Sequence, residues 1–179
     1  MSDTNNSVDI KRRLALRNAS FKALMPIWKK NQISVKLKLK LFCSIIVPVA
    51  MYGCETWTVR VNDSRRLAAF ETKLLRQIAG IKYVDRVSNT DLFKRLQYKT
   101  IILNRVRIQQ FRWLGHVQRM CNDKLPKIAF ESRIHGFRLH GHPSKCWKES
   151  ICDCSLPSPL TMAQNREQYR RQVHSLVRI

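Results

Sequence analysis

The sequence predicts a mainly α-helical protein, because apolar residues recur at spacings of three, four and seven in three long stretches. These stretches are residues 8–30, 64–79 and 101–120. Hydrophobic residues make up 44% of the 179 residues, which is enough to bury a core in one domain or two small ones. We therefore expect helices that pack together through their apolar faces.

The N-terminal stretch 1–7 is polar, and we expect it to be disordered. A helix is predicted from Val8 to Lys30, with Ser7 as its N-cap and Pro26 kinking or ending it. The stripe that should be buried contains Ile10, Leu14, Phe21, Leu24 and Trp28. The cations Lys11, Arg12, Arg13 and Arg17 are expected to lie largely off this stripe.

Within residues 35–47, the lysines at 36, 38 and 40 alternate with apolar residues, a pattern that would also suit a strand. The apolar run that follows, without a turn signal before Pro48, favours one helix capped by Ser34. Gly53 permits a turn, and Trp57 should be buried. We interpret Glu55 as structural, because a lone carboxylate in a basic chain is more often a salt-bridge partner than a general base.

Two further helices are predicted before residue 98. The first carries Leu67, Phe70, Leu74 and Ile78 on one face, is capped by Asp63 or Ser64 and ends at Gly80. The second runs from Asn89 to Leu96, with Ser88 as its cap.

The helix predicted over residues 101–120 has two contrasting faces. Its apolar stripe contains Leu103, Val106, Trp113, Val117 and Met120, with Gln110 as the one polar break. A second, donor-rich stripe contains Arg105, Gln109, Arg112, His116 and Arg119. A basic stripe of this kind is most often a solvated face, and the alternative is a surface that contacts phosphate. After this helix, residues 123–130 are expected to form a connection.

Charge favours the phosphate alternative. The chain has 34 Lys and Arg against 12 Asp and Glu, a formal net charge of +22. A polyanion would offset that self-repulsion, so nucleic acid is the leading partner, ahead of an anionic membrane surface and an acidic protein. The longest uncharged run, residues 41–54, is shorter than the roughly 20 residues of a spanning helix, and no secretion signal is visible. We expect an intracellular protein, nuclear or cytoplasmic, whose six cysteines are buried thiols.

Five strings add a family resemblance: MYGCETW, LAAFETKLLRQIAGI, FRWLGHVQRM, GFRLHGHPSKCW and AQNREQYRRQV. In this order they resemble the C-terminal part of a non-LTR retrotransposon endonuclease/reverse transcriptase, from about Ser7 to Val173. The resemblance implies a thumb-like helical domain at 8–98. It also implies a C-terminal nucleic-acid-binding helical segment at 99–179, with a basic Gly/His/Pro loop. It implies, finally, that the parent protein is an RNA-directed DNA polymerase that uses magnesium.

Catalysis is not expected from this chain alone. Two-metal phosphoryl transfer needs closely placed carboxylates, and no two acidic residues are adjacent in this sequence. We therefore expect the chain to be a fragment that lacks the polymerase palm domain, is inactive alone and has no cofactor of its own. A zinc site from His140, His142, Cys146, Cys152 and Cys154 is disfavoured, because neither a CxxC nor an HxxxH pair is present.

The predicted function is binding of RNA, DNA or their hybrid through backbone phosphates, as part of a reverse transcriptase that holds template and primer. The predicted contact residues are Arg105, Arg112, His116, Arg119, Arg138 and His140. In the loop motif GxRxxGRPxxxW of the family, His142 replaces an arginine, which weakens the expected grip on phosphate. Trp113 and Tyr98 could stack on bases, but core packing is the commoner role of such aromatics. The alternative function is a catalytically inert, vestigial or co-opted structural or protein-interaction module.

Overall fold

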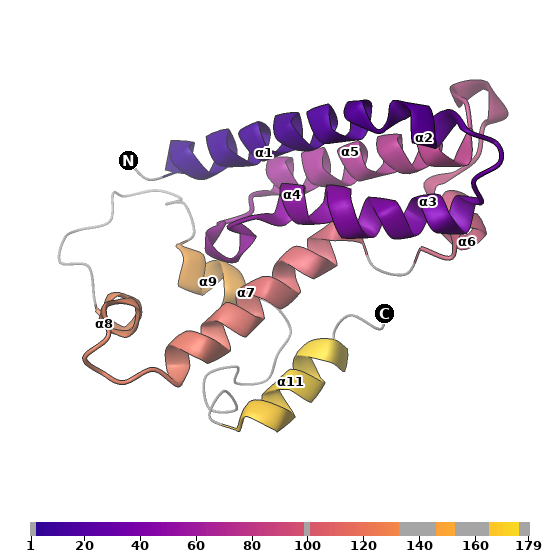
Figure 1. Cartoon of the computed structure of the whole chain (residues 1–179). Coiled ribbons are helices and arrows are strands. Elements are labelled where there is room, and N and C mark those ends of the chain that lie inside the picture. The colour runs from indigo at the N-terminus through magenta and orange to yellow at the C-terminus, as the bar shows by residue number, and fades with distance from the viewer. Residues whose placement is uncertain (1–2, 99–100, 133–145, 153–164, 176–179) are drawn as a thin grey trace. The chain divides into compact units, whose positions relative to one another are not determined.

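The computed structural model describes residues 3–98, 101–132, 146–152 and 165–175, and the regular elements within these ranges are helices (Figure 1). The predicted mainly α fold is thereby confirmed. The chain divides into two compact units. Unit 1 comprises Met1–Gly53 and Val59–Asn104, and unit 2 comprises Cys54–Thr58 and Arg105–Ile179.

Unit 1 is a bundle in which α1, α5 and the rod formed by α3 and α4 lie side by side (Figure 1). Its helices are α1 (Asp3–Ala23), α2 (Met25–Lys29), α3 (Val35–Leu41), the π-helix η1 (Phe42–Ile46), α4 (Val47–Met51), α5 (Val61–Ala79), the 3-10 turn η3 (Tyr83–Asp85) and α6 (Asn89–Leu96). The break between α1 and α2 falls just before Pro26, as predicted.

Two predicted helix caps are wrong. The first helix begins at Asp3 rather than after a disordered stretch 1–7, so Ser7 lies inside α1. Helix α5 begins at Val61, which places Asp63 in its first turn, buried. The Ser7 hydroxyl donates to the Asp63 carboxylate at 3.1 Å. The two polar residues expected to cap separate helices instead join α1 to α5.

The buried stripe of α1 confirms Ile10 and Phe21 but also contains Arg17, which was predicted to lie off it. Arg17 follows Ile10 by seven residues, so helical spacing places it on the same face. Its side chain is 0% exposed, and its guanidinium lies 5.0 Å from the Phe42 ring and 5.2 Å from the Phe70 ring. Burial lowers the pKa of Arg17 to about 10, against the opposing attraction of Glu71.

The helical prediction for residues 35–47 is confirmed, because α3, η1 and α4 follow one another without a break. The Ser34 hydroxyl accepts a hydrogen bond from the Leu37 amide at 3.3 Å, which confirms the predicted cap. The π-helix η1 ends two residues before Pro48, whose ring would clash with the carbonyl four residues earlier in a regular α-helix.

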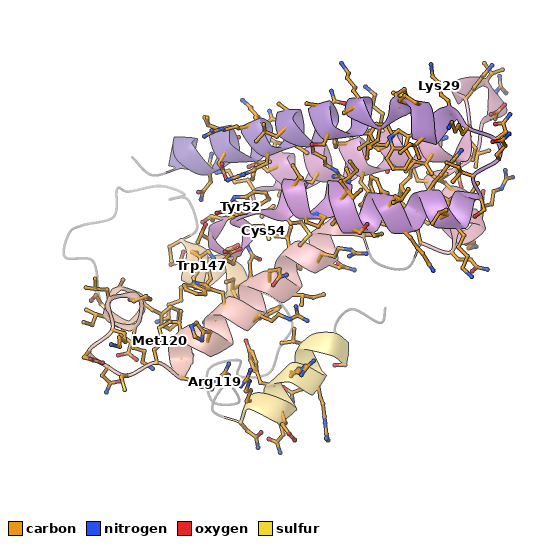
Figure 2. All side chains as sticks on the ribbon, in the orientation of Figure 1. Lys29, Tyr52, Cys54, Arg119, Met120 and Trp147 are labelled. Carbon is orange, nitrogen blue, oxygen red and sulfur yellow. The ribbon has the colours of Figure 1, made fainter. Side chains whose placement is uncertain are left out.

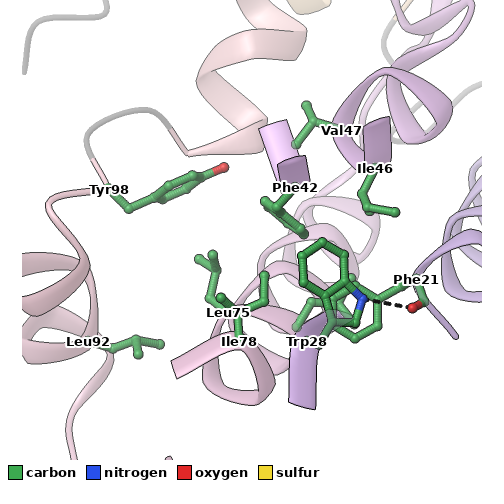
Figure 3. Packing of buried hydrophobic residues seen from close by; sticks show 10 residues of the cluster. Phe21, Trp28, Phe42, Ile46, Val47, Leu75, Ile78, Leu92 and Tyr98 are labelled. Atoms are coloured by element: carbon green, nitrogen blue, oxygen red, sulfur yellow. Dashed lines mark hydrogen bonds between the residues drawn. The ribbon is translucent and has the colours of Figure 1, made fainter. Parts of the chain in front are cut away.

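The core of unit 1 gathers aromatic and aliphatic side chains from all its main helices (Figure 3). Phe21 and Trp28 stack with ring centroids 5.0 Å apart, and the Trp28 indole N–H donates to the Phe21 carbonyl oxygen at 2.8 Å. Glu71 is fully buried and accepts hydrogen bonds from the Tyr98 hydroxyl at 2.7 Å and the Ile102 amide at 3.0 Å. Tyr98 is therefore a core residue.

Local signals at two other helix ends are confirmed. Gly80 ends α5 with φ of 69°, in the left-handed region that glycine tolerates best. Ser88 caps α6 by accepting a hydrogen bond from the Asp91 amide at 3.1 Å.

Unit 2 contains the 3-10 turn η2 (Cys54–Thr56), most of α7 (Ile102–Gln118), α8 (Leu125–Glu131), α9 (Trp147–Cys152) and α11 (Arg166–Ser175). The expected connection at 123–130 is wrong, because α8 forms there with Pro126 in its first turn, where proline is favourable. The buried Lys127 ammonium donates to the Gln118 carbonyl oxygen at 2.8 Å, near the last turn of α7.

Helix α7 is buried over more of its surface than one stripe. Val106 and Val117 are buried as predicted. Gln110, the polar break in that stripe, is buried too, and its amide donates to the Trp57 carbonyl oxygen at 2.7 Å. Leu103, Trp113 and Met120 are only half-buried. Phe111 and Leu114, outside the predicted stripe, are instead core residues that pack with Ile151, Tyr169 and Val173. Because α9 and α11 add this second contact, one apolar stripe could not describe the whole helix.

Candidate nucleic-acid interface

Unit 2 contains a cleft between α7 and α11 with a volume of about 480 Å³. Helix α7 contributes Arg112, His116 and Arg119, and helix α11 contributes Arg166, Tyr169, Arg170 and Val173. Four arginines and a histidine thus line one cleft, and no acidic side chain is among its described lining residues. Figure 2 labels Arg119 at the C-terminal end of α7, beside α11.

The position of α11 against α7 depends on a tyrosine and a glycine. Tyr169 is 4% exposed, and its hydroxyl donates to the Phe111 carbonyl oxygen at 2.8 Å. A Cβ atom at Gly115 would lie 2.5 Å from Cε1 of Tyr169, so the glycine allows the ring to rest directly on the α7 backbone. This contact explains a glycine within a helix, where it is otherwise unfavourable. It also brings the arginines of α11 beside those of α7.

The tyrosine is an uncharged member of the cleft. Burial raises the pKa of Tyr169 to about 12, while the nearby Arg119 acts in the opposite direction. The phenol therefore stays neutral at physiological pH. Since its folded-state pKa exceeds the usual value of 10.0, its contribution to stability is present below pH 10 and is lost as the pH rises toward about 12.

Simple helix geometry places the basic side chains on facing sides of the cleft. Arg112, His116 and Arg119 are separated by four and three residues and share one face of α7. Arg166 and Arg170 are four residues apart on α11 and are exposed. Guanidinium groups can bind phosphate oxygens through two parallel hydrogen bonds. An array of this kind creates a strongly positive local potential that suits a polyanion.

The structure brings together some of the predicted contact residues. Arg112, His116 and Arg119 line the cleft, whereas Arg105, half-buried and two turns earlier on α7, is not among its described lining. The predicted Arg138 and His140 lie outside the described residues. Sequence reasoning missed Arg166 and Arg170. Their spacing within AQNREQYRRQV was a usable signal, because basic residues four apart share a helix face.

Other kinds of site find little support in the described part of the chain. No group of three or more His, Cys, Asp or Glu side chains is placed to hold a metal ion there, although three residues of the disfavoured zinc set, His140, His142 and Cys154, lie outside it. Within the same ranges, no helix combines the length and apolar character needed to cross a membrane. Glu55 accepts the Trp147 indole N–H at its backbone carbonyl, at 2.8 Å.

The fold and the cleft define a class: a strongly basic, mainly α-helical protein with an arginine-rich cleft between two helices. Over 120 residues, or 65% of its length, the chain is 26% identical to an uncharacterized transposon-derived protein of Caenorhabditis elegans. The match spans 43% of that relative, so the chain corresponds to less than half of it. This likeness indicates a transposable-element origin. Neither a protein-family model nor a solved structure matches the chain.

Proposed function

We propose that this chain binds RNA, DNA or an RNA–DNA hybrid through backbone phosphates in the cleft between α7 and α11. The observation that carries the proposal is the convergence of Arg112, Arg119, Arg166 and Arg170 in one cleft whose described lining has no acidic residue. The formal net charge of +22 supports the same class of partner.

We further propose that this binding serves a reverse transcriptase of the non-LTR retrotransposon type, in which the chain would help to hold template and primer. The strings FRWLGHVQRM and AQNREQYRRQV, which carry part of the family resemblance, also contain the polar residues that line the cleft. The transposon-derived relative supports an origin in a mobile element. Polymerisation itself would depend on carboxylates and magnesium supplied by another part of such an enzyme.

The test compares two triple variants that lose the same number of charges. The cleft variant replaces Arg112, Arg166 and Arg170 by glutamine, which removes charge but keeps a long side chain. The control variant replaces Arg12, Arg65 and Arg95, which are exposed on unit 1. Fluorescence anisotropy with a labelled oligonucleotide is measured between about 50 and 200 mM salt.

We expect the cleft variant to lower the slope of log affinity against log salt by about 2 to 3, because each lost phosphate contact removes about 0.7 to 0.9. The control variant should change the slope by less than about 1. Equal losses in the two variants would show that binding is spread over the whole basic surface. An absence of binding at low salt would favour the structural or protein-interaction module.

A further inference from the structure

We propose that the cleft takes single-stranded rather than duplex nucleic acid, with a base stacked on Trp113 beside the arginines. This inference rests on the proposed function and specifies its substrate. Three observations lead to it: the environments of the four tryptophans, the ring contact between Trp113 and His116, and the place of His116 in the lining of the cleft.

The four tryptophans have different environments. Trp28 is buried, and its indole N–H donates to Phe21. Trp57 is buried as well. Trp147 is half-buried and donates to the Glu55 carbonyl oxygen. Trp113 is half-buried too, but no described residue accepts a hydrogen bond from its indole N–H. A tryptophan held on one side and accessible on the other can stack with a small loss of side-chain entropy.

Trp113 lies beside the cleft because of its place on α7. Its ring centroid is 5.6 Å from that of His116, with the planes tilted by 45°. His116 is exposed and is itself one of the cleft-lining residues. The imidazole therefore connects the arginine-rich cleft to the indole. A strand whose phosphates contact Arg112 and Arg119 would carry its next base toward the Trp113–His116 pair.

Base accessibility decides between single and double strands. In a duplex the bases are stacked on their neighbours. A base must therefore be extruded from the stack before its face can contact a side chain on a helix surface. In a single strand every base can present its π-face, and aromatic stacking next to a basic groove is the usual way in which proteins bind such strands. A cleft that combines guanidinium groups with an adjacent aromatic pair fits the single-stranded form.

The first experiment compares Trp113→Leu and Trp113→Phe with the unchanged chain, using a single-stranded oligonucleotide and its duplex. We expect Trp113→Leu to weaken single-strand binding about 5- to 150-fold, the range that corresponds to one lost base stack. The single-strand affinity of Trp113→Phe should lie between those of Trp113→Leu and the unchanged chain. The duplex affinity of each variant should change less than twofold. The salt slope should stay the same, because stacking releases no counterions.

Trp147→Leu serves as the matched control, since it removes a second half-buried tryptophan of unit 2. We expect it to reduce thermal stability without changing the preference between single strand and duplex. If Trp113→Leu leaves single-strand affinity unchanged, the stacking inference is overturned, while the phosphate cleft stands. If the unchanged chain binds neither form, the proposed function itself fails.

A second measurement avoids dependence on the folding of a variant. The unchanged chain is cross-linked by light to a single strand containing 5-bromouridine, and the modified peptides are identified by mass spectrometry. We expect modification of Trp113 within the tryptic peptide that covers residues 113–119. Modification confined to other aromatic residues would overturn the inference.

Discussion

At the scale of single residues, Arg17 is buried although arginine side chains mostly lie at the protein surface. Its guanidinium is enclosed by unit 1, faces two phenylalanine rings and has no hydrogen-bond partner among the described residues. Cation–π contacts and the attraction of Glu71 offset part of the cost of burying the charge. The remaining cost should be measurable, because an unsatisfied buried charged group is expensive.

We expect Arg17→Met to raise the free energy of unfolding by about 1 to 3 kcal/mol, the cost of a buried polar group without a hydrogen-bond partner. Methionine fills a similar space without a charge, and Glu71 keeps its hydrogen bonds from Tyr98 and Ile102. Urea denaturation monitored by circular dichroism gives the value. Arg12→Met, at an exposed position of the same helix, is the control and should change stability by less than about 0.5 kcal/mol. A loss of stability in Arg17→Met would mean that attraction to Glu71 outweighs the desolvation of Arg17.

At the scale of helices, the pairing of α7 with α11 depends on the bare backbone at Gly115. An alanine in a helix interior is normally more favourable than glycine by roughly 0.5 to 1 kcal/mol. At Gly115, however, its Cβ would meet the rigid Tyr169 ring at 2.5 Å, so α11 would have to move. Helix propensity therefore predicts that Gly115→Ala raises the free energy of unfolding, whereas packing against Tyr169 predicts that it lowers it.

We expect Gly115→Ala to lower the free energy of unfolding and to weaken oligonucleotide binding, because Arg166 and Arg170 would be displaced together with α11. Thermal denaturation and anisotropy give the two effects. Tyr169→Ala provides the companion test, since removing the ring should make alanine at position 115 favourable again in the double variant. If Gly115→Ala alone proved stabilising, the contact between α7 and α11 would be ruled out.

At the scale of the whole molecule, the net charge of +22 governs stability as well as binding. Repulsion among so many cations opposes the compact state, and a polyanion that binds the folded chain shifts the equilibrium toward it.

We expect heparin to raise the melting temperature at low salt and to lose this effect as salt increases. Neutral dextran of similar size should have no comparable effect. A melting temperature unaffected by heparin would contradict this role of the charge.

Most helices could be predicted from the sequence because their signals are local. Hydrophobic spacing identified α1, α5 and α7, and single residues such as Ser34, Gly80 and Ser88 correctly marked helix ends. The basic face of α7 was equally visible, because residues three and four apart share a side of any helix. Local signals misjudged α8, because the connection expected at 123–130 is a helix with Pro126 in its first turn.

The sequence by itself therefore determined the helical class, the strong positive charge and the basic face that includes Arg112, His116 and Arg119. The tertiary structure alone decided that Ser7 bonds to Asp63 and that Arg166 and Arg170 join the cleft. The physical reason is the separation along the chain over which each kind of interaction acts. Helix periodicity and capping act within about one or two turns. The choice of partners some 50 residues apart depends instead on how side chains fill space, as Tyr169 does over Gly115.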